Sequence, residues 1–148
     1  MTNQLLMNNN LVLISVKPKY AEKILIGEKT VELRKSSPLR AKKGTNLLIY
    51  VTSPVKELRG ICKIENIYKS TPIDLWNKMG NSTGVSYEEF FEYYKDTENA
   101  YGIELGNIID LQDKSIKLDA LKSMIQGFAP PQTYKYFDKL QFVPFFFL

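Results

Sequence analysis

The chain has no histidine and a single cysteine, Cys62. Without histidine, Ser-His-Asp triads, Cys-His catalytic pairs and histidine-based metal sites are excluded. One cysteine forms neither an internal disulfide nor a CxxC zinc site, so we expect no metal centre. Nothing in the sequence implies an organic cofactor either. Cys62 lies in an apolar stretch at residues 61–64 and is expected to be a small core residue rather than a reactive thiol.

Long apolar runs are also missing. The longest, at residues 47–51 and 143–148, are far shorter than the roughly 20 residues of a membrane-spanning helix, and we expect no membrane partner. Residues 1–10 have neither the basic nor the apolar region of a secretory signal, so we expect a cytoplasmic protein. With 148 residues, 44% apolar, the chain is expected to form one domain over residues 1–148, of which 1–10 are a flexible N-terminal segment.

Positive charge is concentrated in the first half of the chain. Residues 1–69 contain thirteen basic side chains against five acidic ones, whereas residues 70–113 contain two against nine. A basic first half predicts a surface that meets a polyanion such as nucleic acid. Because the middle of the chain is acidic, we expect any nucleic-acid contact to be one-sided.

Hydrophobic patterning predicts about six strands and several short helices. The strands are predicted at residues 11–16, 30–35, 46–52, 58–68, 101–111 and 134–147. Helices are expected at 18–26, after the N-cap Thr71 and after a capping box at Ser86, and residues 116–125 fit either helix or strand. Gly60 is expected at a bulge or a close backbone approach. Only one helix lies directly between the first two strands, which favours a small curved or closed mixed sheet of the α+β class over a doubly wound fold.

The segment from Gly27 to Arg34 has the most distinctive chemistry. Gly27 is suited to end the preceding helix in a left-handed turn, so that the Lys29 ammonium is aimed from a fixed backbone. Strict alternation from Thr30 onward puts Glu32 and Arg34 on one polar strand face. The two are expected to pair, either as an ordinary exposed ion pair or as a unit in which Arg34 meets a phosphate or base edge and Glu32 accepts from an exocyclic amine.

Gly27, Lys29, Glu32 and Arg34 match the motif GxKxxExR, and at this point the chain resembles the ASCH domain family. The resemblance covers most of residues 11–140 and extends to later segments at residues 48–51, 59–60, 100–103 and 130–134. It implies a fold like that of the PUA superfamily, which is a small β-barrel with short peripheral helices and a cleft beside the first helix. It also implies recognition of RNA, or of a modified nucleobase or nucleotide, in that cleft.

The resemblance makes Lys29 the central candidate, with Gln132 and Thr133 closing the far wall of the cleft by hydrogen bonds. Tyr50, Tyr101 and Tyr134 lie on other predicted strands, where they could stack a splayed base. For at least two of the three, a buried ring with one satisfied hydroxyl is expected instead. The expected ligand-binding residues are Lys17, Lys29, Glu32, Arg34, Tyr50, Ser53, Tyr101, Gln132 and Tyr134. The basic loop after residue 34 is either a solvated loop or a phosphate-contacting one that acts through Lys35, Arg40, Lys42 and Lys43.

Three alternatives to a pure RNA-binding or nucleotide-binding role are open. One branch of the family resembles amidohydrolases of acylated cytidine, which use the motif lysine and a threonine three residues later. Glu32 occupies that place here, and a carboxylate nucleophile would give a labile anhydride. Another branch is linked to metal-independent RNA cleavage by the motif lysine and a late hydroxyl, which correspond to Lys29 and Thr133, with Glu32 as a further candidate catalytic residue. The acidic, aromatic stretch at 74–98 would instead suit a protein partner in the regulation of transcription or translation.

Overall fold

The computed structural model describes residues 10–37 and 41–145 of the chain. The predicted flexible segment at 1–10 therefore lies outside the described residues except for Asn10, and so does Arg40 of the basic loop. Within the described part of the chain, no helix is long and apolar enough to cross a membrane.

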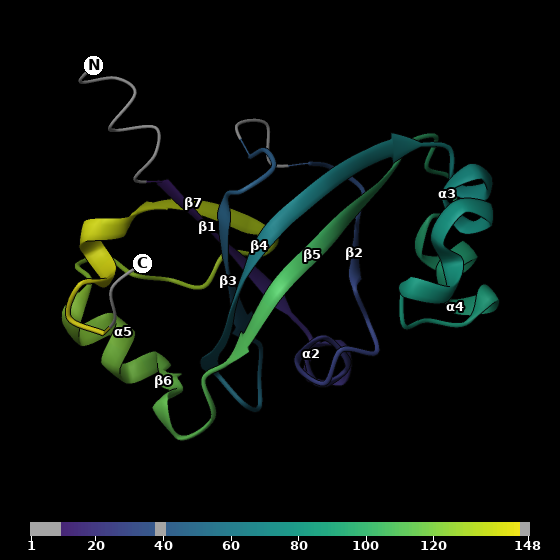
Figure 1. Ribbon diagram of the computed structural model, residues 1–148. Helices are drawn as coiled ribbons and strands as arrows, with labels where there is room; N and C mark the ends of the chain where they lie inside the picture. The colour runs from purple at the N-terminus through teal and green to yellow at the C-terminus, as the bar shows by residue number, and fades with distance from the viewer. Residues whose placement is uncertain (1–9, 38–40, 146–148) are drawn as a thin grey trace, which may run out of the picture.

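A seven-stranded mixed sheet forms the centre of the molecule (Figure 1). Its strands follow the order β2-β5-β4-β3-β1-β7, and β6 pairs with the start of β4. β1 and β3 are parallel, and the other pairings are antiparallel. The strands are β1 (Asn10–Val16), β2 (Val31–Arg34), β3 (Asn46–Val51), β4 (Glu57–Ser70), β5 (Ala100–Asp110), β6 (Ile116–Lys117) and β7 (Tyr134–Asp138).

The sheet bends but does not close. β2 and β7 are its two edges, and no strand pairing joins β2 to β1 or β7 within the described residues. The predicted α+β class and curved mixed sheet are therefore confirmed, whereas a closed barrel is not what forms. We call the gap between β2 on one side and β1 with residues 131–133 on the other the seam. Side chains rather than backbone pairs bridge it.

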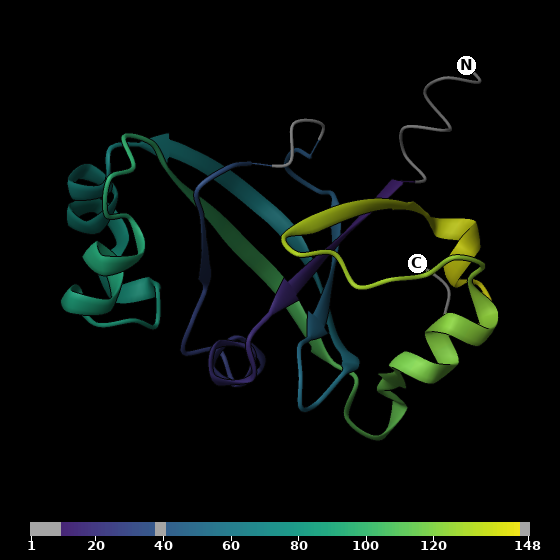
Figure 2. The ribbon, with the colours of Figure 1, turned by 180° about the vertical axis from the view of Figure 1, so that it is seen from behind.

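In the described part of the chain, four short helices surround the sheet: α2 (Pro18–Leu25), α3 (Pro72–Met79), α4 (Tyr87–Tyr93) and α5 (Leu118–Met124). In Figures 1 and 2 the α3–α4 pair and α5 lie on opposite sides of the molecule, with α2 between them. The predicted start signals are confirmed, because Pro18 opens α2, Thr71 caps α3 and Ser86 forms a capping box. Gly27, with φ of 84°, follows the end of α2 as expected.

The C-terminal region differs from the prediction. Residues 116–125 contain both alternatives, β6 followed by α5. The predicted strand at 134–147 is shorter, because β7 ends at Asp138 and residues 139–142 form a 3-10 turn. Asp138 and Gln141 make a capping box there, which starts a turn instead of continuing the ladder. Residues 146–148 lie outside the described part.

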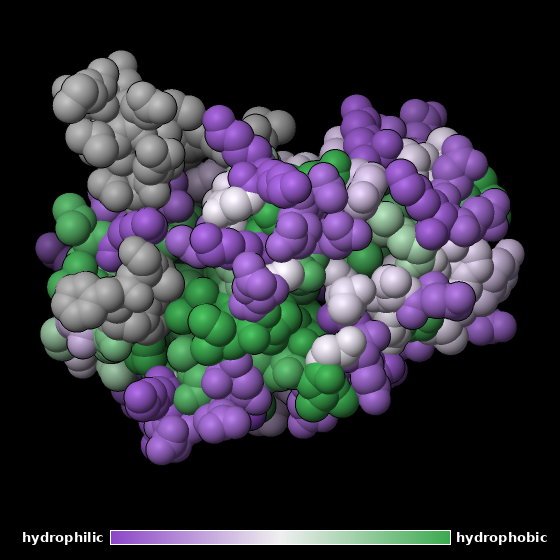
Figure 3. Space-filling model, in the orientation of Figure 1, coloured by the Kyte–Doolittle hydropathy of each residue, from purple (hydrophilic) through white to green (hydrophobic). Residues whose placement is uncertain are grey.

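Alternation along β1 separates the two faces of the sheet. Leu11 and Leu13 face a core cluster that includes α5, whereas Val12 and Ile14 face a cluster that includes α2. A third cluster joins β2 to α3 and α4. In the view of Figure 3, apolar side chains gather over the region where Figure 1 shows the start of β4 and the end of β5.

Gly60 and Cys62 behave as the sequence indicates. The register of β3 and β4 shifts beside Gly60, and a Cβ atom at Gly60 would lie 2.9 Å from the Leu25 side chain of α2. Gly60 therefore marks both a bulge and a close approach. Cys62 is buried in the α2 cluster, and this burial raises the pKa of its thiol to about 12, so it is a core residue.

Candidate functional site

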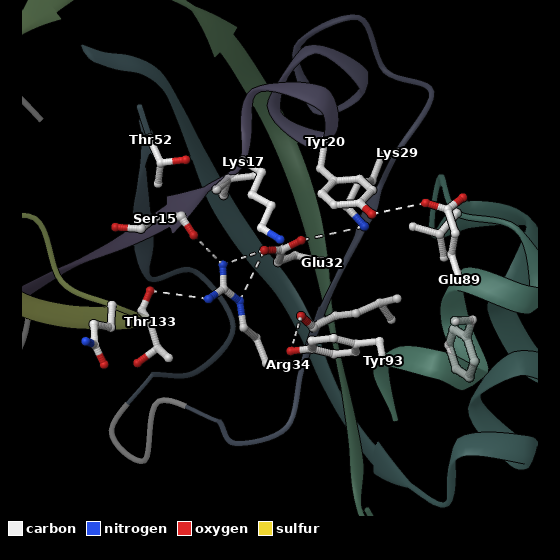
Figure 4. Close-up of a pocket in the computed structure, with 15 residues that line it drawn as sticks. Ser15, Lys17, Tyr20, Lys29, Glu32, Arg34, Thr52, Glu89, Tyr93 and Thr133 are labelled. Atoms are coloured by element: carbon white, nitrogen blue, oxygen red, sulfur yellow. Dashed lines mark hydrogen bonds and ion pairs between the residues drawn. The ribbon is translucent and has the colours of Figure 1, made fainter. Parts of the chain in front are cut away.

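A pocket with a volume of about 410 Å³ opens at the seam (Figure 4). This volume falls within the range of about 300–1,000 Å³ that is typical of small-molecule sites. Its walls come from the end of β1, the start of α2, β2, α4 and the segment before β7. Six of the predicted site residues line it together: Lys17, Lys29, Glu32, Arg34, Gln132 and Thr133.

Lys29 is a buried cation at the pocket wall, with only 2% of its surface exposed. The turn after α2 places it there, because the Lys29 backbone N–H donates to the carbonyl of Lys23. Its ammonium donates to the Thr83 carbonyl at 2.5 Å and lies 3.6 Å from Glu32 Oε1. Burial lowers the pKa of Lys29 below its ordinary value, although Glu32 partly opposes the shift.

Glu32 lies between two cations. Its Oε2 atom accepts from Arg34 Nε at 3.1 Å and from Arg34 Nη2 at 2.5 Å, while Oε1 faces Lys29. The side chains of Glu32 and Arg34 are 8% and 11% exposed, so this is not the exposed ion pair that the sequence left open. The predicted pairing is present, and it is buried in the pocket wall.

Arg34 bridges the seam. Its Nη2 donates to the Ser15 carbonyl at 2.9 Å and its Nη1 donates to the Thr133 carbonyl at 3.3 Å. The Ser15 backbone N–H donates to the same Thr133 carbonyl at 3.1 Å, and its hydroxyl donates to the carbonyl of Pro131. Of the five N–H donors of a guanidinium, these bonds and those to Glu32 leave one on Nη1. Arg34 therefore ties β2 to β1, and it has little capacity left for the predicted phosphate contact.

A second set of contacts fixes the α4 wall of the pocket. Glu89 Oε2 accepts from Lys19 Nζ at 3.0 Å and from the Tyr20 hydroxyl at 3.1 Å, which joins α4 to α2. Tyr93, also on α4, donates from its hydroxyl to the Leu33 carbonyl at 3.4 Å. In Figure 4 the Tyr20 and Tyr93 rings lie on two sides of the pocket, with Glu32 and Lys29 between them.

The remaining predicted ligand residues do not line the pocket. Tyr50 is buried on the other face of the sheet, in the cluster that includes α5. Ser53 is exposed in the turn after β3, and Tyr101 lies on β5 away from the pocket. Tyr134 donates from its hydroxyl to the Ser37 carbonyl. Because side-chain direction alternates along each strand, tyrosines on three strands do not converge on one site.

The basic loop approaches the pocket at one residue. Lys35 is exposed, and its ammonium lies 4.9 Å from the centre of the Tyr93 ring. Lys42 and Lys43 are exposed and do not line the pocket, and Arg40 lies outside the described residues. In the described part of the chain, no group of three or more Cys, Asp or Glu could hold a metal ion.

Sequence reasoning missed several residues of the pocket. They are Ser15, Tyr20, Thr52, Glu89 and Tyr93. Tyr20 lies inside the segment that resembles the family, and Glu89 forms part of the predicted capping box. For both residues, the nearby sequence therefore gave a reason to consider them. Tyr93 carried none, because its place depends on α4 packing against β2, some 60 residues earlier in the chain.

We expect the Glu89 contacts to make stability depend on pH under acidic conditions. The backbone N–H of Ser86, and then Lys19 and Tyr20, lower the pKa of Glu89 from 4.5 to about 2. A carboxylate with a lowered pKa in the folded state contributes stability above its unfolded pKa, and this is lost as the pH falls. The melting temperature of Glu89→Gln should lie below that of the wild type at pH 7, and the difference should shrink between pH 4.5 and about 2. A difference that stays constant over this range would contradict the assignment.

Comparisons with known proteins first identify the class of domain. The crystal structure of ASCH from Zymomonas mobilis superposes with a TM-score of 0.80 at 32% identity, over 88% of this chain and 89% of that one. A curated Zymomonas mobilis protein named ASCH domain-containing ribonuclease is 33% identical over 126 residues, which are 85% of this chain and 83% of that protein. The large ribosomal subunit protein uL22 of Ureaplasma parvum is 29% identical over 93 residues, 62% of this chain and 29% of that protein.

The family itself follows from these matches. Residues 11–125 match the family model described as "Domain of unknown function (DUF365)". Together with the identity to the Zymomonas mobilis protein over most of both chains, this shows that the chain belongs to the ASCH domain family.

Proposed function

We propose that the seam pocket binds one unpaired nucleotide of a single-stranded RNA. The observation that carries this proposal is the pair formed by the Lys29 ammonium and Glu32 Oε1, 3.6 Å apart in the wall of a nucleotide-sized pocket. The name of the Zymomonas mobilis relative supports RNA as the ligand, and the partial match to a ribosomal protein agrees with it.

The Lys29–Glu32 pair supplies a donor beside an acceptor. Arg34 occupies Glu32 Oε2, so Oε1 is the oxygen with acceptor capacity left for a ligand. Lys29 donates to the Thr83 carbonyl and retains further N–H donors. The Watson–Crick edge of a base also presents donors next to acceptors, and that edge is free only when the base is unpaired. The pocket therefore suits a base from a single strand.

Aromatic rings provide the second element of recognition. Tyr20 and Tyr93 line the pocket, and stacking on such rings is the common way for proteins to hold a splayed RNA base. Tyr93 takes this role in place of the tyrosines at 50, 101 and 134 that the sequence indicated.

Replacing Tyr93 tests RNA binding by the pocket. Loss of one base-stacking ring typically costs about 1–3 kcal/mol, so Tyr93→Ala should weaken binding of a fluorescein-labelled RNA octamer by about tenfold or more in fluorescence anisotropy. Tyr101→Ala removes a ring outside the pocket and is the matched control, since it should leave the affinity within about twofold of the wild type. Equal losses in both variants, with circular dichroism showing folded proteins, would contradict a binding role for the pocket.

RNA cleavage is the second candidate function, and the lowered pKa of Lys29 favours it. Neutral Lys29 would accept the proton of a ribose 2′-hydroxyl as that oxygen attacks the adjacent phosphorus. The bond to the 5′-oxygen then breaks, that oxygen takes up a proton, and the products are a 2′,3′-cyclic phosphate and a 5′-hydroxyl. Thr133, which lines the pocket, and Glu32 stay predictions for this reaction.

The other two alternatives gain no further observation. Glu32 replaces the threonine of the amidohydrolase branch and is held by two cations, while Thr30 is exposed and does not line the pocket. Residues 74–98 form α3, α4 and their connections, so a protein-binding role for that stretch stays a prediction.

A further inference from the structure

Three lysines near the pocket form hydrogen bonds from their ammonium groups to other residues of the protein. Lys19, Lys23 and Lys29 donate to oxygens of residues 83–89, at 3.0, 2.7 and 2.5 Å respectively. These bonds fasten the segment before α4, and α4 itself, to α2 and the turn after it. The three ammonium groups therefore hold the wall of the pocket, and each has at least one of its three N–H donors bonded to the protein.

Two other lysines differ from this group. Lys17 lines the pocket, and Lys35 lies with its ammonium over Tyr93, which lines the pocket too. Both side chains are exposed, and neither ammonium has a hydrogen bond or an ion pair to a protein oxygen within residues 10–37 and 41–145. These cations are thus available to an anionic ligand.

The strand directions place Lys17 and Lys35 on opposite sides of the contact between Arg34 and the Ser15 carbonyl. β1 runs parallel to β3, and the chain direction then reverses at each step through β4 and β5 to β2. β1 and β2 therefore run in opposite directions on the two sides of the seam. Arg34, the last residue of β2, donates to the carbonyl of Ser15 near the end of β1. Lys17 follows the last residue of β1 and Lys35 follows the last residue of β2, so the two lysines lie past this contact in opposite directions along the seam.

Between these two lysines, the interior of the pocket offers little to a phosphate. Arg34 has four hydrogen bonds to protein oxygens, and Lys29 is partly neutralised by Glu32. A phosphate would gain most from an exposed cation whose charge no protein oxygen balances. The interior suits a base, and the exposed ammonium groups of Lys17 and Lys35 suit the phosphates.

We infer that an RNA strand crosses the mouth of the pocket along the seam, with Lys17 and Lys35 contacting the phosphates on either side of the bound nucleotide. This inference rests on the proposed function and specifies its substrate class. The ligand is an internal nucleotide of a strand rather than a free nucleoside, because only an internal nucleotide has a phosphate on each side.

The salt dependence of RNA binding tests this path. For single strands, each phosphate contact contributes about 0.7 to the slope of log affinity against log salt. Between about 50 and 300 mM KCl, Lys17→Ala and Lys35→Ala should each reduce the slope for a labelled RNA octamer by about 0.7, and the double variant by about twice that. Lys122→Ala, at an exposed position of α5 outside the pocket, should leave the slope unchanged. Tyr93→Ala should lower the affinity with the slope retained.

The results of these binding experiments distinguish a failure of the RNA path from a failure of the proposed function. If the double variant binds RNA with the slope of the wild type, the path is wrong and the nucleotide pocket stands. If free cytidine, adenosine, guanosine or uridine displaces the octamer at a concentration equal to that of unlabelled octamer, the internal-nucleotide requirement is wrong. If the wild-type protein binds no RNA, the proposed function fails and the path fails with it.

Discussion

Glu32→Gln is expected to lower the free energy of unfolding by about 3–5 kcal/mol, the range for removing one partner of a buried ion pair. The Lys29 ammonium and the Arg34 guanidinium would then lie in a buried wall opposite a neutral amide. In a chain of 148 residues this corresponds to a fall in melting temperature of roughly 10 °C. Urea denaturation followed by circular dichroism measures the loss directly.

The chain offers a matched control for this prediction. Glu57 and Arg59 on β4 have the same spacing as Glu32 and Arg34 on β2, but their ion pair is longer, at 3.5 Å, and their side chains are 18% and 39% exposed. Surface pairs of this kind contribute about 0–1 kcal/mol. Glu57→Gln should therefore cost less than 1 kcal/mol. Equal losses in the two variants would show that burial of Glu32 does not set its contribution.

Local signals made the core of the site predictable. Gly27 ends α2 in a left-handed turn, and alternation along β2 places Glu32 and Arg34 on one face, as the segment indicated. Those features depend on neighbours within about eight residues. The same holds for the helix caps at Thr71 and Ser86, since the sequence signal of each cap spans only three or four consecutive residues.

Features set by distant packing were not predictable in this way. Arg34 is predicted to contact a phosphate or a base edge, and its own strand gives no sign of the Ser15 and Thr133 carbonyls that accept from it across the seam. The open sheet has the same origin, since no local pattern states whether two edge strands will pair. Tyr93 enters the pocket only through the packing of α4 on β2. Pocket composition at a seam thus depends on contacts between segments far apart in the chain.

The seam also changes how motif residues are interpreted. A lysine, a glutamate and an arginine on one short segment suggest three ligand contacts. In this structure, each of the three has a different role. Arg34 replaces the strand pairing that a closed barrel would have, Glu32 balances the two cations, and Lys29 is the buried cation that lines the pocket. Substitutions at the three positions should therefore have different effects on stability and on the proposed RNA binding.

Lys29 variants should separate charge from proton transfer. Lys29→Met removes the donor to the Thr83 carbonyl and should cost about 1–3 kcal/mol of stability along with most RNA affinity. Lys23→Met is the control, because Lys23 also donates to a backbone carbonyl, that of Gly84, but does not line the pocket. It should lose less stability than Lys29→Met, because the bond of Lys23 is only partly buried and Lys29 also pairs with Glu32, and it should keep RNA binding.

Lys29→Arg decides whether Lys29 acts as a general base. A guanidinium keeps the positive charge but does not lose its proton in proteins. If the protein cleaves RNA through Lys29, this variant should bind an RNA octamer and cleave it at least 100-fold more slowly, since general bases contribute about 10²–10⁴-fold. The wild-type cleavage rate should also rise with pH, with a midpoint below the ordinary lysine pKa of 10.5, because only the neutral amine accepts a proton. If Lys29→Arg still cleaves RNA, Lys29 is a cation that binds RNA and not a general base. The same conclusion holds if the wild-type protein binds RNA without cleaving it.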